Sequence, residues 1–204
     1  MTKDILQLSG PVLWVVVATL VCGAVAFVAF VERGFHIHRA RIKTDDFLKG
    51  IRNILRGGNP DEAVSICEDT PGPVAHIVKA AILHRGDNPE MLKAAVDDAG
   101  LVEIERLESR VGIIATVAQI APLLGLLGTV FGLMTLLGDL GASQWQSAAV
   151  TVGLKRALVA TAAGLCVAIP CYAAYNLVTA KIASLVVDME RAASEIMAFL
   201  ANRK

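Results

Sequence analysis

Three runs without Asp, Glu, Lys or Arg constrain this chain more than any other feature of its sequence. They cover residues 11–31, 111–138 and 157–180, and each contains at least 21 residues. At a rise of about 1.5 Å per residue, a helix of that length crosses the roughly 30 Å hydrocarbon core of a bilayer. The sequence therefore predicts an all-α integral membrane protein with three transmembrane helices.

The ranges between these runs complete the predicted organisation. We expect a short periplasmic N-terminus over 1–10, a cytoplasmic helical domain over 32–110, a periplasmic loop with the start of the third span over 139–156, and a cytoplasmic C-terminal helix over 181–204. Apolar residues keep 3-4 spacing on the inner side of the last two spans. This favours long second and third transmembrane helices that extend into the cytoplasmic domain, the second as one helix continuous with the segment after Pro89.

The distribution of Lys and Arg predicts the orientation. Twelve of the 19 lie in 32–110, against one before the first span and two between the second and third. Because positive residues stay in the cytoplasm, we expect a multi-pass protein whose N-terminus lies outside and whose C-terminus lies in the cytoplasm; in a bacterial cell the outer side would be the periplasm. A signal peptide is the alternative for 11–31. The apolar run exceeds the ~7–15 residues of a signal sequence, and Glu32 follows it without a cleavage site, so we favour an anchor.

Small residues predict where the spans pack. In the stretch APLLGLLGTVFG, Gly125, Gly128 and Gly132 leave one side of the second helix nearly bare. The third span carries a ladder of small residues at Ala160, Gly164 and Ala168. Such spacing lets two membrane helices approach closely. Pro170 is expected to kink the third helix, and Asn176 is expected to be a buried amide near its inner end.

Thr129 and Thr161 lie beside these small residues, each in the outer half of its helix. One hypothesis is that they form a ring of hydroxyls in the wall of a central space. The alternative is that each hydroxyl bonds the carbonyl four residues earlier in its own helix, as membrane threonines commonly do. From spacing alone, the bond to the helix's own carbonyl is favoured over the hydroxyl ring.

None of the three spans contains an acidic side chain. A proton relay needs a titratable group, so a carboxylate would have to come from a partner. The chain also lacks GxSxG, HExxH and P-loop motifs, and its four cysteines show no metal-ligand spacing. We therefore expect no enzymatic activity, no catalytic residue, no metal, no cofactor and no nucleic-acid partner.

The motifs APLLGLLGTVFGLM and ALVATAAGLCVAIPCYAAYN resemble the MotA/TolQ/ExbB proton-channel family, and most closely its ExbB/TolQ branch. The resemblance covers nearly the whole chain. It implies a homo-oligomer of the bacterial inner (cytoplasmic) membrane, a pentamer, that surrounds the transmembrane helices of an ExbD/TolR-like single-span partner. That partner carries the proton-accepting Asp. Proton flow then energises an outer-membrane system, such as TonB-dependent transport, through a TonB- or TolA-like protein.

The resemblance also assigns residues. Thr129 and Thr161 match the family's pore-lining threonines, and Pro122, with the glycines of the second span, matches its glycine-rich helix. Pro170, Tyr175 and Asn176 match the end of the third span, the last two without an assigned role. Arg156 departs from the pattern, because close relatives carry Glu there. We expect Arg156 in the proton pathway, paired with Asp139 or a partner carboxylate, or else extended outward to the lipid headgroups.

Two other functions remain open. A flagellar-type stator subunit of the MotA branch has four spans, and this chain shows three. A non-conducting membrane scaffold would instead use its cytoplasmic domain to recruit soluble proteins.

Overall fold

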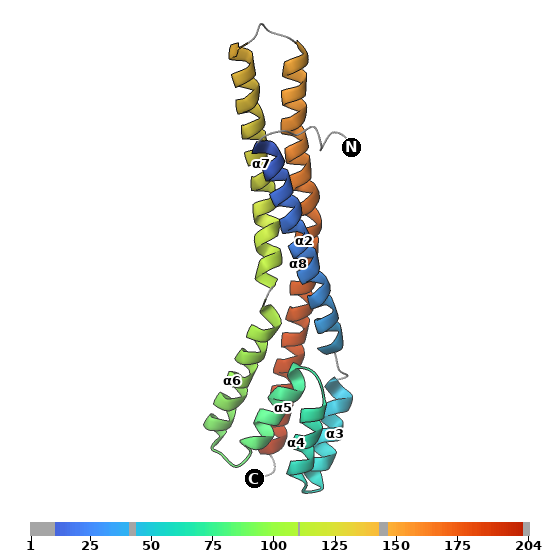
Figure 1. Cartoon of the computed structure of the whole chain (residues 1–204). Coiled ribbons are helices and arrows are strands. Elements are labelled where there is room, and N and C mark those ends of the chain that lie inside the picture. Colours follow the sequence, from blue (N-terminus) through green and yellow to red (C-terminus); the bar gives the residue numbers. More distant parts are fainter. Residues whose placement is uncertain (1–10, 41–43, 110, 143–146, 202–204) are drawn as a thin grey trace. The chain divides into compact units, whose positions relative to one another are not determined.

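The computed structural model describes residues 11–40, 44–109, 111–142 and 147–201, and almost all of them are helical (Figure 1). The helices are α2 (Pro11–Ala40), α3 (Thr44–Arg56), α4 (Pro60–Asp69), α5 (Pro73–Leu83), α6 (Pro89–Glu108), α7 (Val111–Ala142) and α8 (Ser147–Ala201). No strand occurs within the described residues. The predicted all-α class is confirmed.

Three of the helices are long and apolar enough to cross a bilayer, and they include Val12–Phe35, Val111–Gly138 and Val150–Ala201. This confirms the three predicted spans. The chain forms two compact units. The membrane unit comprises Met1–Val31 and Arg110–Leu177, and the hairpin unit comprises Glu32–Ser109 and Val178–Lys204. Helices α2 and α8 each contribute to both units.

In the membrane unit, α7 and α8 lie side by side and run in opposite directions (Figure 1). Helix α7 continues to Ala142 and α8 begins at Ser147, so most of the range 139–156 is helical, and residues 143–146 lie outside the described part. Helix α8 continues through Pro170 without interruption for 55 residues. The long third helix is therefore as predicted.

Three helices of the hairpin unit, α4, α5 and α6, begin with proline. Pro60, Pro73 and Pro89 each occupy a first-turn position, where the missing N–H costs no hydrogen bond. Gly58 and Gly72 have φ values of 86° and 122°, so the chain turns between helices in conformations that favour glycine. Helix α5 is the centre of this unit, because its apolar residues are nearly all buried.

Helix α3 contacts the C-terminal part of α8 within the hairpin unit. The spacing predicted for the end of α8 is seen in its buried residues, Ile182, Leu185, Met189, Ala192 and Ile196. Around this stripe, Arg52 pairs with Glu195, and Arg191 Nη2 lies 3.3 Å from Asp45 Oδ1. The Arg56 guanidinium lies 5.9 Å from the centre of the Phe199 ring. These contacts join α3 to the C-terminal part of α8.

The prediction of one helix from Pro89 into the membrane is wrong. Helix α6 ends at Glu108 and α7 begins at Val111, with Ser109 extended at φ −55° and ψ 139°. The buried Arg33 explains the end of α6. Its guanidinium donates to the carbonyl oxygen of Arg106 at 3.3 Å and also to the Ser109 hydroxyl. A cation at a helix C-terminus satisfies carbonyls that have no partner in the helix.

Candidate functional site

Glycine and alanine form the contact between α7 and α8. A methyl group added to Gly125 would lie 3.1 Å from the carbonyl oxygen of Ala160 and 3.2 Å from the Cα of Gly164. One added to Gly164 would lie 2.7 Å from the carbonyl oxygen of Ala121. The two backbones therefore touch here, which only small residues permit. We call this contact the small-residue seam.

The seam continues toward the loop that joins α7 to α8. A methyl group on Gly132 would lie 3.1 Å from both the Cα and the Cβ of Ala157, and one on Gly153 would lie 2.9 Å from the Cβ of Leu136. Gly153 was not among the predicted packing residues. Its spacing of seven from Ala160 on the same helix face was the signal for it.

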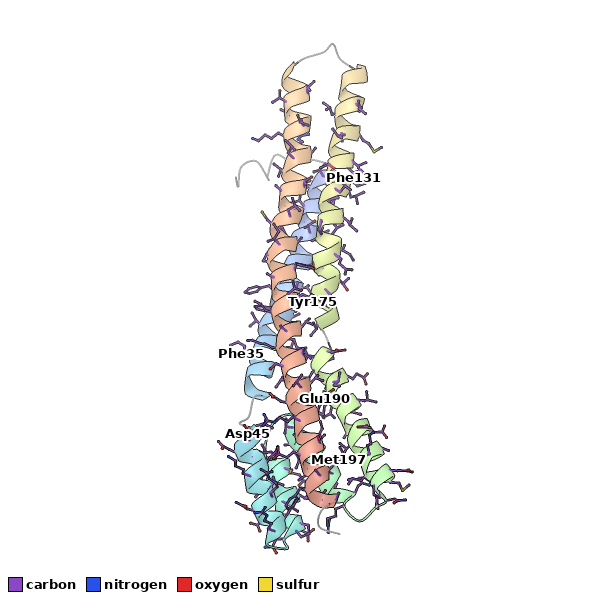
Figure 2. The ribbon with its side chains drawn as sticks, turned by 180° about the vertical axis from the view of Figure 1, so that it is seen from behind. Phe35, Asp45, Phe131, Tyr175, Glu190 and Met197 are labelled. Atoms are coloured by element: carbon purple, nitrogen blue, oxygen red, sulfur yellow. The ribbon has the colours of Figure 1, made fainter. Side chains whose placement is uncertain are left out.

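Helix α2 covers one side of this pair. Near its start, Val12 and Val16 form a buried cluster with Ala160, and Phe131 and Val159 pack against it. Further along, Ala26 forms a second cluster with Val117, Ala118 and Cys171. Figure 2 labels Phe131 on α7 and Tyr175 on α8. One flank of the α7–α8 pair is therefore occupied by α2.

Thr129 and Thr161 lie on the other flank. Thr129 is two residues before Phe131, and Thr161 is two residues after Val159. Two residues correspond to about 200° around a helix, so both threonines point away from α2. Both are half-buried at the edge of the seam. Gly128, which directly precedes Thr129, lies against Ala160, which directly precedes Thr161, so the two helices bring the threonines to similar depth.

The Thr129 hydroxyl donates to the carbonyl oxygen of Leu126 at 2.6 Å. That acceptor is three residues earlier in the helix, not the four of the alternative considered from sequence. Thr19, Thr116 and Thr135 likewise donate to carbonyls of their own helices. A hydroxyl that donates to the backbone still offers oxygen lone pairs. Thr129 can therefore accept a hydrogen bond from a group on its open side.

The other predicted site residues are distributed along the same two helices. Arg156 is half-buried and directly precedes Ala157 of the seam. The side chain of Asp139, its hypothesised partner, lies outside the described residues. Ala168 is buried, and Pro122 and Pro170 lie inside continuous helices. Tyr175 is half-buried.

The prediction that Asn176 is a buried amide is wrong. Its side chain is exposed in the single chain, because this position of α8 lies away from both α2 and the seam.

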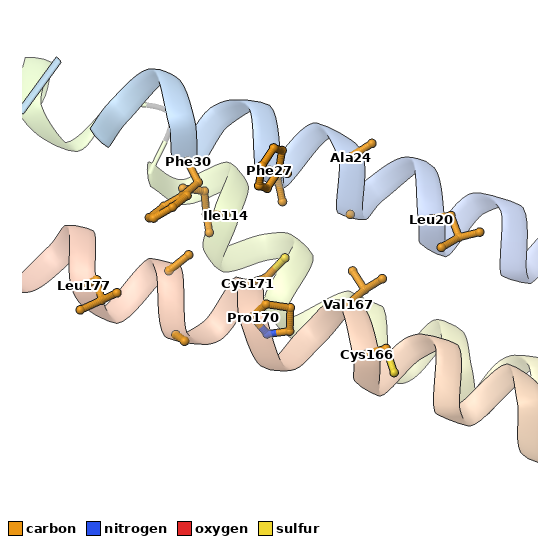
Figure 3. Close-up of a pocket in the computed structure, with 14 residues that line it drawn as sticks. Leu20, Ala24, Phe27, Phe30, Ile114, Cys166, Val167, Pro170, Cys171 and Leu177 are labelled. Atoms are coloured by element: carbon orange, nitrogen blue, oxygen red, sulfur yellow. The ribbon is translucent and has the colours of Figure 1, made fainter. Parts of the chain in front are cut away.

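An apolar pocket of about 580 Å³ lies on the flank that α2 covers (Figure 3). Phe27 and Phe30 of α2 line it together with Val167 and Pro170 of α8 and Ile114 of α7. Its only side-chain heteroatoms are the thiols of Cys166 and Cys171. The side chains of the pocket lining therefore carry no oxygen or nitrogen atom, whereas the hydroxyls of Thr129 and Thr161 lie on the opposite flank. Within the described residues, no cluster of three or more His, Cys, Asp or Glu side chains is arranged to bind a metal.

Similarity to known proteins identifies the family of this chain. Residues 69–191, more than half of the chain, match the profile of the MotA/TolQ/ExbB proton channel family. The chain belongs to this family. The match includes both sides of the small-residue seam.

Named relatives place the chain with ExbB and TolQ. It is 28% identical to the biopolymer transport protein ExbB of Neisseria gonorrhoeae, over 99% of this chain and 98% of that protein. It is 41% identical over 87 residues to the Tol-Pal system protein TolQ of Haemophilus influenzae, covering 42% of this chain and 38% of TolQ. An ExbB homolog of Methanothermobacter thermautotrophicus is 27% identical over 85% of this chain, which spans 62% of that protein. The chain therefore spans less than two thirds of the last two proteins.

Proposed function

We propose that this protein is the ring subunit of a proton channel in the bacterial inner membrane. In this proposal it forms a homo-oligomer, a pentamer, around an ExbD/TolR-like single-span partner that carries an Asp. Proton flow through the complex energises an outer-membrane process such as TonB-dependent transport. The single observation that carries the proposal is the position of Thr129 and Thr161, both on the flank of the small-residue seam that α2 leaves open.

The two flanks of the membrane unit support this assignment. In the charge-free run of α2, the exposed side chains are apolar apart from the indole N–H of Trp14, and they include Leu20, Val21, Val25 and Phe27. That surface suits lipid. The threonines occur on the other flank, where a polar group can meet water or a partner. In a ring, α2 would form the outer wall while α7 and α8 line the interior.

The charge pattern supports the need for a partner. The membrane run of α7 has no ionisable group, and neither does the run 157–180 of α8 apart from cysteine and tyrosine. Neutral hydroxyls can order water but cannot serve as a charged proton carrier. In the proposed mechanism the partner's carboxylate takes the proton, Thr129 and Thr161 position it, and Arg156 lies near the outer end of the path. The protein would couple a proton gradient to movement and would not act as an enzyme.

Co-purification tests the assembly. We expect the chain extracted from membranes in mild detergent to have the mass of an oligomer and to carry a small single-span protein with an intramembrane Asp. A stable monomer would contradict the ring.

Proton flux tests the activity. The purified complex is reconstituted into vesicles under an imposed pH gradient and membrane potential, with a pH-sensitive dye inside. We expect acidification of the lumen above the leak of empty vesicles. An intact complex without flux would instead favour the non-conducting scaffold.

A further inference from the structure

Two further polar side chains, Gln119 and Tyr172, lie inside the membrane runs, closer to the cytoplasmic side than Thr129 and Thr161. Gln119 of α7 is nine residues from Arg110, and Tyr172 of α8 is nine residues from Lys181, the charged residues that end these runs. Nine residues of helix span about 13 Å, which places both near the middle of a ~30 Å hydrocarbon core. Both side chains are exposed, and Tyr172 is 59% exposed.

Both residues point away from α2. Gln119 is two residues after Val117, which packs against Ala26 of α2. Tyr172 is two residues after Pro170, which lines the apolar pocket beside α2. The same half-turn argument that places Thr129 and Thr161 therefore places Gln119 and Tyr172 on the open flank. The two levels are ten residues apart on α7 and eleven on α8, or about 15 Å.

Lipid is a poor environment for the carboxamide of Gln119. A carboxamide that faces hydrocarbon loses its hydrogen bonds with water, which is costly. The Gln119 side chain is too short to reach headgroups about 13 Å away, and no described residue forms a hydrogen bond with it. Its hydrogen-bonding partners must come from outside the chain, on the flank where the threonines lie.

We infer that Gln119 and Tyr172 bind water and form the inner half of the proton path, which continues inward from Thr129 and Thr161. An amide and a phenol each donate and accept hydrogen bonds, so both suit a chain of water molecules. A hydronium ion passes its proton to the next water in such a chain. Where Tyr172 takes part, its oxygen accepts one proton as its hydroxyl donates another. Each group ends neutral, and one proton has crossed. This inference rests on the proposed function.

Thiol labelling tests the water, independently of any partner. Gln119→Cys and Tyr172→Cys are made in a background with all four native cysteines replaced by Ala, and reconstituted in phosphatidylethanolamine–phosphatidylglycerol vesicles. Val25→Cys is the matched control, because Val25 is exposed next to Ala26 at the same depth but on α2. The probe is a trimethylammonium methanethiosulfonate, which reacts with thiolates in water.

We expect positions 119 and 172 to react at least tenfold faster than position 25. Equal, slow labelling at all three positions would overturn the inference. So would protection of position 119 together with a disulfide between two copies of the Gln119→Cys chain, because a second copy would then cover this flank in place of water.

Flux measurements test the path. In the co-purified complex, we expect Gln119→Leu and Tyr172→Phe each to lower proton flux about tenfold without changing the amount of partner bound. Thr19→Val is the control, since Thr19 is buried and donates to the Val15 carbonyl at 2.8 Å. If the unaltered complex conducts and both variants conduct equally well, the inference fails and the proposed function stands. If the unaltered complex does not conduct, both fail.

Discussion

Gly128 and Ala160 face each other so closely that a Cβ on Gly128 would lie 2.5 Å from the Cβ of Ala160. No flexible side-chain end can move aside here, because the opposing atom is itself a Cβ. Val15 of α2 lies on the same glycine, 3.4 Å from the added atom. The three membrane helices thus meet at one residue that has no side chain.

Gly128→Ala should therefore destabilise the membrane unit. Overpacking of a close contact costs about 1–3 kcal/mol, which exceeds the helix propensity of up to about 1 kcal/mol that alanine gains over glycine. We expect a lower midpoint of thermal unfolding in detergent. Gly112→Ala is the matched control, since an added Cβ there meets nothing within 4 Å. Equal stability of the two variants would show that the seam is looser than described.

Thr129→Val should lower proton flux about tenfold or more while the complex still assembles. Valine keeps the shape of threonine but removes the oxygen that can accept a hydrogen bond on the open flank. Flux in vesicles and the amount of bound partner are measured together.

Thr135→Val is the control for that experiment. Thr135 also donates to a carbonyl of its own helix, that of Gly132 at 2.8 Å, but it lies one turn from Phe131 on the flank that α2 covers. The control should conduct normally. A loss of flux in both variants would point to a general effect on α7 and against a specific role of Thr129.

Arg33→Ala should loosen the end of α6. Hydrogen bonds from a charged donor contribute about 1.5–3 kcal/mol each, so amide exchange near Glu108 and Ser109 should become about tenfold faster or more. Arg191→Ala is the comparison, because its ion pair with Asp45 is exposed and should contribute less than about 1 kcal/mol. Unchanged exchange in Arg33→Ala would mean that Ser109 ends α6 without this cap.

Sequence patterns could predict much of this fold, for physical reasons visible in particular residues. Hydrocarbon excludes charge, so the runs without Asp, Glu, Lys or Arg mark the spans directly. Helical periodicity likewise identifies the faces that carry Gly125 and Gly164. The break at Ser109 depends instead on Arg33, 76 residues away, and local spacing contains no signal for it.

The sequence also contains no signal for the side of the α7–α8 pair against which α2 packs. It depends on packing between Val16, Phe131 and Val159, which come from three different helices. Without it the direction of Thr129 could not be assigned. The structure supplies that direction, and the same reasoning then reveals Gln119 and Tyr172.

The ionisation of the Cys67 thiol should make the free energy of unfolding decrease as pH rises. Burial raises the pKa of its thiol from 9.0 to about 11, although Lys79 acts in the opposite direction. Well below pH 9 the thiol is neutral in both the folded and the unfolded state. Between about 9 and 11 the unfolded chain releases the proton and the folded chain retains it, so the free energy of unfolding decreases as pH rises, by about 2–3 kcal/mol at most.

Cys67→Ala should remove the decrease in the free energy of unfolding that the thiol causes above pH 9. The smaller alanine side chain should lower the stability at neutral pH. The measurement is the unfolding of both proteins in detergent at pH 8 and pH 10.5, with the difference between them compared at each pH. Other groups titrate in this range, but they are common to both proteins. The difference should shrink at the higher pH. If it stays constant, the thiol ionises as easily in the fold as in the unfolded chain.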